Sequence, residues 1–399
     1  MRFSPTLLKL LTGIAVLPTG AYATNNAAFL DQGSLLAAGQ NNLALIDQSS
    51  GSDNLAGTGA TPLRQLGTSN QLTLIQSGDR NSTGTAPTGL IQTSALSAAS
   101  NNALLLQHSS DNTIGAVRQA STATAGAAGN TLVIEQGLAG TPGTDGNSID
   151  RVVQQRRGAQ GNTASVLQQG ANNSIALVAQ ISEGPGLAPN RIEIVQFGDD
   201  NGTAPLTGVA DSVGATVGVY AQGATASGGA DNSLSLEIIG DHNATGTRQN
   251  GTGNSMGDTL NPILIAGSDN AFGGTQSGMD NQLSLSILGD GNEVGTQQNG
   301  IANMITLDIG PASDSNSVLF GQAGTDNMIT AAVTGAFNSA TLMQTGSANT
   351  GLLTVTGDYN TIDGLQNGNG NSATVTQIGN ANSAVFSQLG NNNTVTILQ

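Results

Sequence analysis

The feature that most constrains this chain is an asparagine that returns every 11 residues through its last third. The repeating unit reads Gly-x-x-Asn-x-h-x-h-x-Gln-x, where h is a small or branched apolar residue. The chain has 28 asparagines in this frame, and 16 of the 27 gaps between them are 11 residues long. Most other gaps contain insertions rich in Gly, Ala, Pro or Thr. A repeat this short indicates identical small elements stacked on one another.

Each unit alternates with a period of two residues, which is typical of a β-strand. In the last third, Ala384, Phe386 and Gln388 share one face, and Ser383 and Val385 share the other. The Gly-x-x segment before each asparagine is rich in turn-forming residues. The sequence therefore predicts an all-β fold, a β-solenoid of stacked two-strand coils with 11 residues per strand-turn unit, about 22 residues per coil and loop insertions in the N-terminal half. About 17 coils would fit the chain, or fewer once insertions are discounted.

A second regularity indicates that two strands form one coil. From Gln276 onward, the sixth position after each frame asparagine alternates between Gln and Ile or Val, as in Gln298 and Ile309. If successive strands lie on opposite walls, one wall carries a glutamine column and the other an aliphatic column. The alternation stops at Gln377, after which every strand carries Gln.

Parallel stacking would place like residues of successive coils above one another, so we expect amide ladders around a dry interior of small apolar residues. Ladder amides bond to the coils above and below, which avoids the cost of an unsatisfied buried polar group. The candidate ladder residues are Asn316, Asn327, Asn338, Asn349, Asn360, Asn371, Asn382, Asn393, Gln322, Gln344, Gln366, Gln377, Gln388 and Gln399. The candidate turn glycines are Gly335, Gly346, Gly357, Gly368, Gly379 and Gly390.

The first residues indicate export. Residues 1–23 are typical of a secretory signal peptide, with Arg2 and Lys9 flanking a short apolar stretch and small residues at the expected cleavage site. We expect irregular repeats with insertions over 24–230 and regular repeats over 231–399. No segment has the length of a transmembrane helix. Without residues 1–23 the chain has 8 basic and 26 acidic residues, which argues against nucleic-acid binding through a basic patch.

Catalytic and cofactor chemistry has little support in the sequence. His108 and His242 both lie in expected turns, and neither is near enough ligands for a triad or a zinc site. No cofactor or metal is expected, and we expect no enzymatic activity. Turns such as 289–292 resemble those of calcium-binding β-rolls, but the half-coil length differs and the Asp position drifts. Calcium binding in these turns stays an open alternative.

The ends of the repeat favour self-assembly. Soluble solenoids need caps, because an open stacking edge recruits another chain. The frame starts at Asn26 and runs to Gln399, so we expect head-to-tail stacking of copies into a homopolymer, templated by the regular coils of 316–399. Acidic residues directly precede several frame asparagines, and their repulsion is expected to slow premature aggregation. They are Asp53, Asp111, Asp200, Asp231, Asp269, Asp280 and Asp326.

The unit resembles the curlin repeat, Gln-x-Gly-x-x-Asn-x-Ala-x-x-x-Gln. The segments 366–377 and 377–388 match every fixed position, and 335–344 matches without the leading Gln. The resemblance implies a subunit of curli, extracellular amyloid fibres on the bacterial surface that support adhesion and biofilm matrix. It also implies export through a dedicated outer-membrane pore and nucleation by a related minor curlin. The chain is longer than known curli subunits and carries aliphatic residues on alternate strands.

A second class of function is a monomeric surface-exposed solenoid, such as an adhesin or an ice-binding module. Ice binding would need a continuous outward threonine array. Thr374, Thr376, Thr394 and Thr396 form a local patch, and the sequence suggests that Ser383, Val385, Ser387, Met343 and Leu319 interrupt it.

Overall fold

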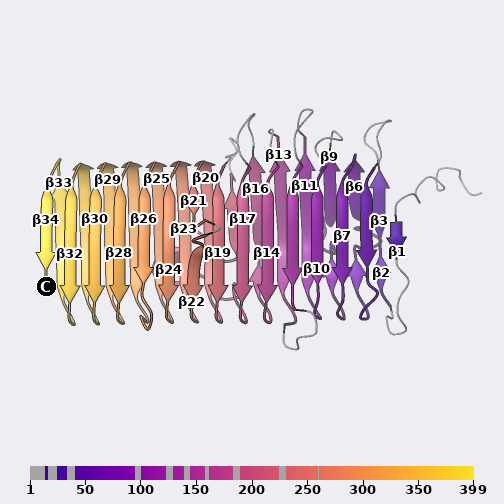
Figure 1. The fold of residues 1–399 in the computed structure, drawn as a ribbon, viewed down its shortest axis with the longest axis horizontal. Coiled ribbons are helices and arrows are strands. Elements are labelled where there is room, and N and C mark those ends of the chain that lie inside the picture. Colours follow the sequence, from indigo (N-terminus) through magenta and orange to yellow (C-terminus); the bar gives the residue numbers. More distant parts are fainter. Residues whose placement is uncertain are drawn as a thin grey trace, which may run out of the picture. The chain divides into compact units, whose positions relative to one another are not determined.

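The computed structural model describes residues 14–16, 25–33, 41–94, 100–122, 129–138, 144–157, 161–182, 189–223, 231–258 and 260–399. The expected signal peptide lies largely outside these residues. The chain forms two compact units, Met1–Asn190 and Arg191–Gln399. Each is a stack of coils with two walls of parallel strands, called wall A and wall B below (Figure 1).

In the first unit, wall A is a single run of parallel strands and wall B is made partly of short strand pairs. Wall A consists of β1 (Ile14–Val16), β4 (Leu43–Asp47), β7 (Gln71–Gln76), β10 (Asn102–Gln107), β12 (Thr131–Gln136) and β14 (Thr163–Gln169). Wall B consists of β2 (Ala27–Ala28), β3 (Leu30–Gly33), β5 (Leu55–Ala56), β6 (Leu63–Gly67), β8 (Ser82–Thr83), β9 (Leu90–Ser94), β11 (Thr113–Ser121), β13 (Ser148–Arg156), β15 (Ser174–Ile175) and β16 (Leu177–Ser182).

The second unit has the same plan with longer strands. Wall A consists of β17 (Arg191–Phe197), β19 (Ser233–Ile239), β21 (Ser255–Met256), β22 (Ile263–Ala266), β24 (Gln282–Leu288), β26 (Met304–Ile309), β28 (Met328–Thr334), β30 (Thr350–Thr356), β32 (Ser372–Ile378) and β34 (Thr394–Leu398). Wall B consists of β18 (Val219–Gln222), β20 (Ala244–Thr252), β23 (Ala271–Met279), β25 (Glu293–Ile301), β27 (Ser317–Thr325), β29 (Ser339–Ser347), β31 (Thr361–Asn369) and β33 (Ser383–Leu389).

The strand registers confirm a parallel β-solenoid of two-strand coils. Ser339 lies beside Thr361, 22 residues later, and Thr361 lies beside Ser383, so the regular coils have the expected length. Insertions lengthen other coils, as where Thr113 lies beside Ser148, 35 residues later. The average is therefore about 26 residues per turn, with about 13 turns in place of the expected 17.

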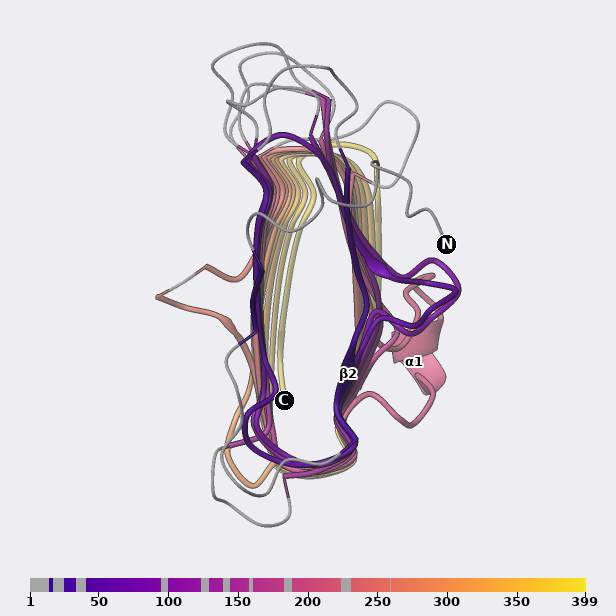
Figure 2. The same cartoon turned by 90° about the vertical axis from the view of Figure 1, so that its right-hand side faces the viewer.

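The core of each unit lies between its two walls, which face each other across a narrow interior (Figure 2). Alternate residues of each strand point inward, as shown by buried Ala384 and Phe386 on β33 between exposed neighbours. Phe386 lies beside Gly364 in register, and a Cβ added at Gly364 would lie 2.4 Å from Cζ of this ring. A glycine inside β31 thus leaves room for one of the chain's few aromatic rings.

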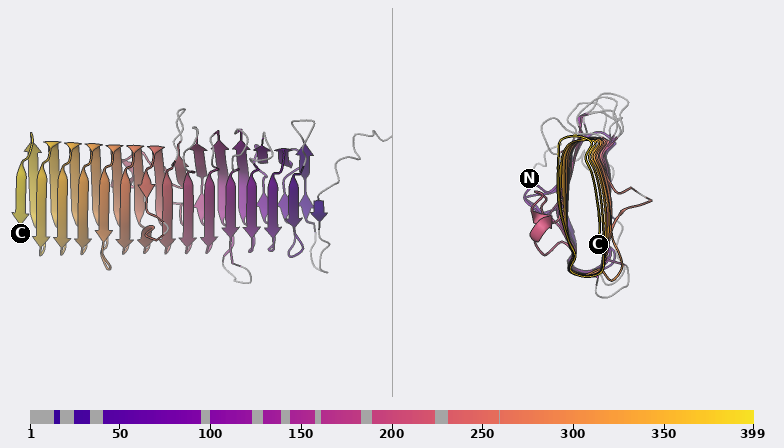
Figure 3. Two further views of the ribbon diagram at one scale, coloured as in Figure 1. Left: turned by 45° about the horizontal axis from the view of Figure 1, so that its top comes forward. Right: turned by 90° about the vertical axis from the view of Figure 1, so that its left-hand side faces the viewer.

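A segment of 202–218, including the single turn α1 (Gly208–Asp211), covers part of the outer face of wall B in the second unit (Figure 3). Leu206, Ala210 and Val213 form a small apolar cluster there with strand residues such as Ala271. The strands below carry glycines at this point. A Cβ added at Gly273 would lie only 2.0 Å from the Ala210 carbonyl oxygen. In the sequence this segment was visible only as an unusually long gap between frame asparagines.

Candidate functional site

Asparagine columns run along the coil edges, one for each wall. Asn338 donates its backbone N–H to Oδ1 of Asn316 in the preceding coil at 2.9 Å, and its Nδ2 donates to the same oxygen at 3.0 Å. That Nδ2 also donates to the carbonyl oxygen of Gly357, in the turn of the following coil, at 2.8 Å. Each amide therefore bonds to the coil before it and to the coil after it. All the frame asparagines from Asn316 to Asn371 are buried.

Glutamine columns run inside the solenoid, parallel to the asparagine columns. On wall B of the second unit, Gln322 Nε2 donates to Gln344 Oε1 at 2.9 Å, and Gln344 Nε2 donates to Gln366 Oε1 at 2.7 Å. Gln344 Nε2 also reaches the facing wall, where it bonds the Met328 carbonyl oxygen at 3.0 Å. The glutamines thus join successive coils and also join the two walls.

Glutamine side chains and asparagine backbone N–H groups donate in opposite directions along the chain. Glutamine Nε2 groups donate toward the following coil, whereas asparagine backbone N–H groups donate to the Oδ1 of the preceding coil. The later face of a coil consequently offers glutamine donors and asparagine acceptors. Its earlier face offers the complementary groups.

The structure places glutamine and aliphatic columns on different walls of the second unit. Wall B carries Gln222, Gln249, Gln276, Gln298, Gln322, Gln344, Gln366 and Gln388. At the same position wall A carries Ile287, Ile309, Val333 and Val355. Gln377 then follows Val355 and donates to Gln399 at 2.9 Å. Because Val355 offers no donor, the buried Oε1 of Gln377 has no hydrogen-bond partner in the described residues. In the first unit both walls carry glutamines.

Most turns place a glycine three residues before the frame asparagine and a residue with a left-handed conformation directly before it. Gly335 has φ 107°, and a Cβ added there would lie 2.2 Å from the Gly357 carbonyl oxygen of the next coil. The other candidate turn glycines also have positive φ. The acidic residues noted above occupy the position directly before asparagine, and their φ angles are 55–62°, as at Asp111 and Asp269. Asp tolerates this conformation better than most side chains, which gives these residues a backbone role.

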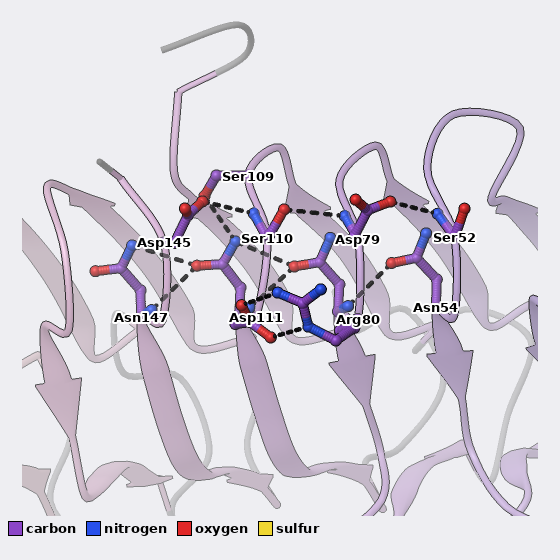
Figure 4. Close-up of polar contacts among 11 residues, drawn as sticks. Ser52, Asn54, Asp79, Arg80, Ser109, Ser110, Asp111, Asp145 and Asn147 are labelled. Carbon is purple, nitrogen blue, oxygen red and sulfur yellow. Dashed lines mark hydrogen bonds and ion pairs between the residues drawn. The ribbon is translucent and has the colours of Figure 1, made fainter. Parts of the chain in front are cut away.

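A third column lies in the turns and was not expected from the sequence (Figure 4). The residue two positions before the frame asparagine accepts, with its side-chain oxygen, the backbone N–H of its counterpart in the preceding coil. Ser52 N–H donates to Asp79 Oδ1 at 2.6 Å, and Ser110 N–H donates to Asp145 Oδ1 at 2.8 Å. In the second unit Asp358 and Asn380 act in the same way. The signal was the frequent Asp, Asn or Ser after the turn glycine.

The outer face of wall A in the second unit corrects the expectation about threonines. Thr374 and Thr396 lie side by side on wall A, and so do Thr376 and Leu398. Val385 and Met343, with the other residues expected to interrupt the patch, belong to wall B. One column of wall A reads Ser284, Thr306, Thr330, Leu352, Thr374 and Thr396. The array on wall A is broken by Leu352 in this column, and by Asp308, Ala332 and Leu398 in the column two residues further along the strands.

Comparison with known proteins bears on the most regular coils. Residues 368–399 match the model of the curlin associated repeat. The chain therefore carries a curlin repeat in its last coils. The match covers the segment in which both walls carry glutamine and the spacing is unbroken. No curated protein matches the chain.

The two histidines form local contacts. His108 Nδ1 lies 3.2 Å from Ser77 Oγ, and its Nε2 lies 3.8 Å from Glu135. His242 occupies a left-handed turn position, with its Nε2 3.6 Å from Asp200. Within the described ranges, no group of three or more His, Asp or Glu side chains could hold a metal. No helix in the same ranges is long and apolar enough to cross a membrane.

Proposed function

We propose that this curlin-repeat protein is a structural subunit that joins copies of itself, coil on coil, into extracellular curli-like amyloid fibres. The fibres would lie on a bacterial surface and serve adhesion and biofilm matrix. Export through an outer-membrane pore and nucleation by a related minor curlin belong to the same proposal. The protein would have no enzymatic role.

The observation that carries this proposal is the complementarity of the two faces of a coil. Gln344 donates toward the following coil and accepts from the preceding one, and Asn338 does the reverse with its backbone N–H and Oδ1. Coils of different molecules can therefore join through the bonds that join coils of one molecule. Stacked in-register strands with amide ladders are the arrangement of cross-β fibres.

Fibre formation can be measured directly. The chain without residues 1–23 is expected to give thioflavin T fluorescence, fibres in electron micrographs, and diffraction at about 4.8 Å along the fibre and about 10 Å across it. A version lacking residues 316–399 should form fibres more slowly or not at all, since it lacks the most regular coils. A full-length protein that stayed monodisperse over days would contradict the proposal.

The threonine array on wall A favours a second candidate function, binding to a repetitive surface such as ice. Strand spacing places Thr374 and Thr396 about 4.8 Å apart, and residues two apart along a strand about 7 Å apart. The test is inhibition of ice recrystallisation by the wild type, by Thr330→Lys on wall A and by Thr341→Lys on the outer face of wall B. Activity lost only in Thr330→Lys would support this role, and an inactive wild type would eliminate it.

A further inference from the structure

A hollow of about 490 Å³ opens on the outer face of wall B in the first unit. Ile91 on β9 and Val153 on β13 form part of its floor. One rim is the loop of residues 84–89, which contributes Thr88; violet loops of this part of the chain project outward from the wall that carries β2 in Figure 2. The loop is attached to the wall by a hydrogen bond from the Ala86 N–H to the Gly115 carbonyl oxygen, 3.1 Å long. The hollow is therefore formed by regular strands and an anchored loop.

Two arginines contribute to the lining of this hollow. Arg118 lies on β11, in register between Ile91 and Val153. Arg151 lies on β13 beside Ala116, two residues earlier along the neighbouring strand. From the strand spacing and the rise along a strand, their Cα atoms are roughly 8 Å apart. Both guanidinium groups can consequently reach one small ligand.

Neither arginine has an acidic partner within 4.0 Å in the described part of the chain. Arg64, beside an adjoining hollow, pairs with Asp31 at 3.2 Å, and Arg80 pairs with Asp111. Asp150 precedes Arg151 and is exposed, but it forms no ion pair with it. The whole chain has 10 basic residues against 26 acidic ones. Two uncompensated arginines in one hollow are therefore unusual for this protein.

The remaining lining indicates the chemistry of a ligand. Guanidinium groups bind carboxylates through paired, charge-assisted hydrogen bonds. Thr88 and Thr93 add hydroxyl groups that can donate to or accept from a polyol. Ile91, Val153 and Ala116 provide an apolar floor for the C–H face of a sugar ring. Few polar groups over an apolar floor are typical of small-molecule sites.

We propose that this hollow binds a carboxylated sugar, a uronic acid residue, whose carboxylate lies between Arg118 and Arg151. Its opening faces away from the coil axis, so stacking of coils leaves it accessible. The inference is independent of whether the protein forms fibres.

Calorimetric titration of the full chain tests the proposal with three probes: a galacturonate trisaccharide, a neutral galactose trisaccharide and inorganic phosphate. We expect the uronate to bind and the neutral sugar to bind at least about tenfold more weakly, because the latter offers the arginines no charge. Arg118→Gln and Arg151→Gln should each weaken uronate binding by about tenfold or more. Arg118→Lys keeps the positive charge but loses the paired N–H donors of the guanidinium group, so it should lose part of the affinity.

Arg248→Gln is the matched control, because Arg248 is an exposed arginine on wall B of the second unit and loses the same charge. All three Gln variants should keep the wild-type circular dichroism and thermal midpoint. The proposal fails if Arg248→Gln weakens binding as much as the other two, if the neutral sugar binds equally well, if phosphate binds and uronate does not, or if no uronate binding is detected.

Discussion

Phe337 stacks on Tyr359 in the next coil, with ring centroids 5.1 Å apart and ring planes at 8°. Both residues occupy the left-handed turn position, with φ of 57° and 58°, and both rings are exposed. Aromatic side chains rarely adopt this backbone conformation. The pair therefore offsets part of the local backbone strain.

A double-mutant cycle on this pair measures the stacking energy separately from the strain. Phe337→Ala, Tyr359→Ala and the double variant all keep a Cβ in the left-handed position. The coupling free energy from urea unfolding should be about 0.5–1.5 kcal/mol. A coupling near zero would mean that the rings lie together without stabilising the turn.

Two glycines of one turn should respond differently to substitution. Gly289 has φ 141°, and a Cβ there would lie 2.3 Å from the Ser313 carbonyl oxygen of the next coil. Gly291 has φ 65°, and its nearest neighbour would be Ser315 Oγ at 3.5 Å. Gly289→Ala is expected to lower the free energy of unfolding by about 3 kcal/mol or more, and Gly291→Asn to change it by less than about 0.5 kcal/mol. Equal effects would contradict the close approach of successive turns.

Replacing Gln344 by Leu should interrupt the glutamine column. Gln366 Oε1 would lose its donor while staying buried, and Gln322 Nε2 would keep only its bond to the Met304 carbonyl oxygen. The expected loss in unfolding free energy is about 1–3 kcal/mol. Thr345→Val, an exposed substitution on the same strand, serves as the control, and a loss as small as the control's would show that the column contributes no stability.

The pair Arg80–Asp111 predicts a pH dependence. Arg80 donates Nε and Nη2 to the two carboxylate oxygens at 2.7 and 2.6 Å, and this contact lowers the pKa of Asp111. A lowered folded-state pKa contributes stability that is complete above the unfolded value of about 3.9 and lost as the pH falls through the folded value. Wild type should therefore lose more stability between about pH 5 and pH 3 than Asp111→Asn.

Asp269→Asn is the control for this comparison, because Asp269 has the same left-handed turn position without an arginine partner in the described residues. The expected difference in urea midpoint between the two pH values is smaller in Asp111→Asn and unchanged in Asp269→Asn. The same slope in wild type and Asp111→Asn would rule out a contribution from the pair.

Deleting two repeat units, which make one full coil, should leave the fold intact, whereas deleting one unit should destabilise it. Removal of residues 339–360 excises one coil of 22 residues and joins Asn338 to Thr361, the residue beside Ser339 in the register. Removal of 339–349 joins Asn338 to Thr350, a wall A residue, and places Val355 after Gln322 in the wall B column. The first variant should keep the fold and a cooperative melt, whereas the second should lose several ladder bonds and melt at a lower temperature. Similar melting temperatures would contradict the assignment of walls.

The sequence predicted the length of the coil. Asn338, Asn360 and Asn382 are 22 residues apart, and each bonds to the next from successive coils. It also predicted that Gln344 and Val333 belong to different walls. They lie in successive 11-residue units, and two successive units form the two walls of one coil. It did not predict which exposed residues are neighbours on one wall. The sequence analysis wrongly treated Val385 as a neighbour of Thr374 on the same wall. The two residues are 11 apart and therefore lie on opposite walls.

The segment of 202–218 and the arginine hollow were outside the reach of the repeat frame. Each depends on an insertion returning to a particular wall, as Ala86 does to Gly115 and Thr207 does to Glu293, with a Thr207 Oγ1 to Glu293 Oε1 bond of 2.8 Å. Insertions carry no periodic signal, so only tertiary contacts show where they lie. The turn column of Asp79 and Asp145 was missed for another reason, since Asp is common in any turn.

In each glutamine column every side chain donates toward the following coil, so the stack of coils is polar. Dipoles aligned head to tail add along a column, and reversing a molecule would bring N–H to N–H and oxygen to oxygen. If two copies join through these columns, the bonds can form in one relative orientation only. A filament grown through this contact would have two chemically different tips, and subunits would be gained at the two tips at different rates.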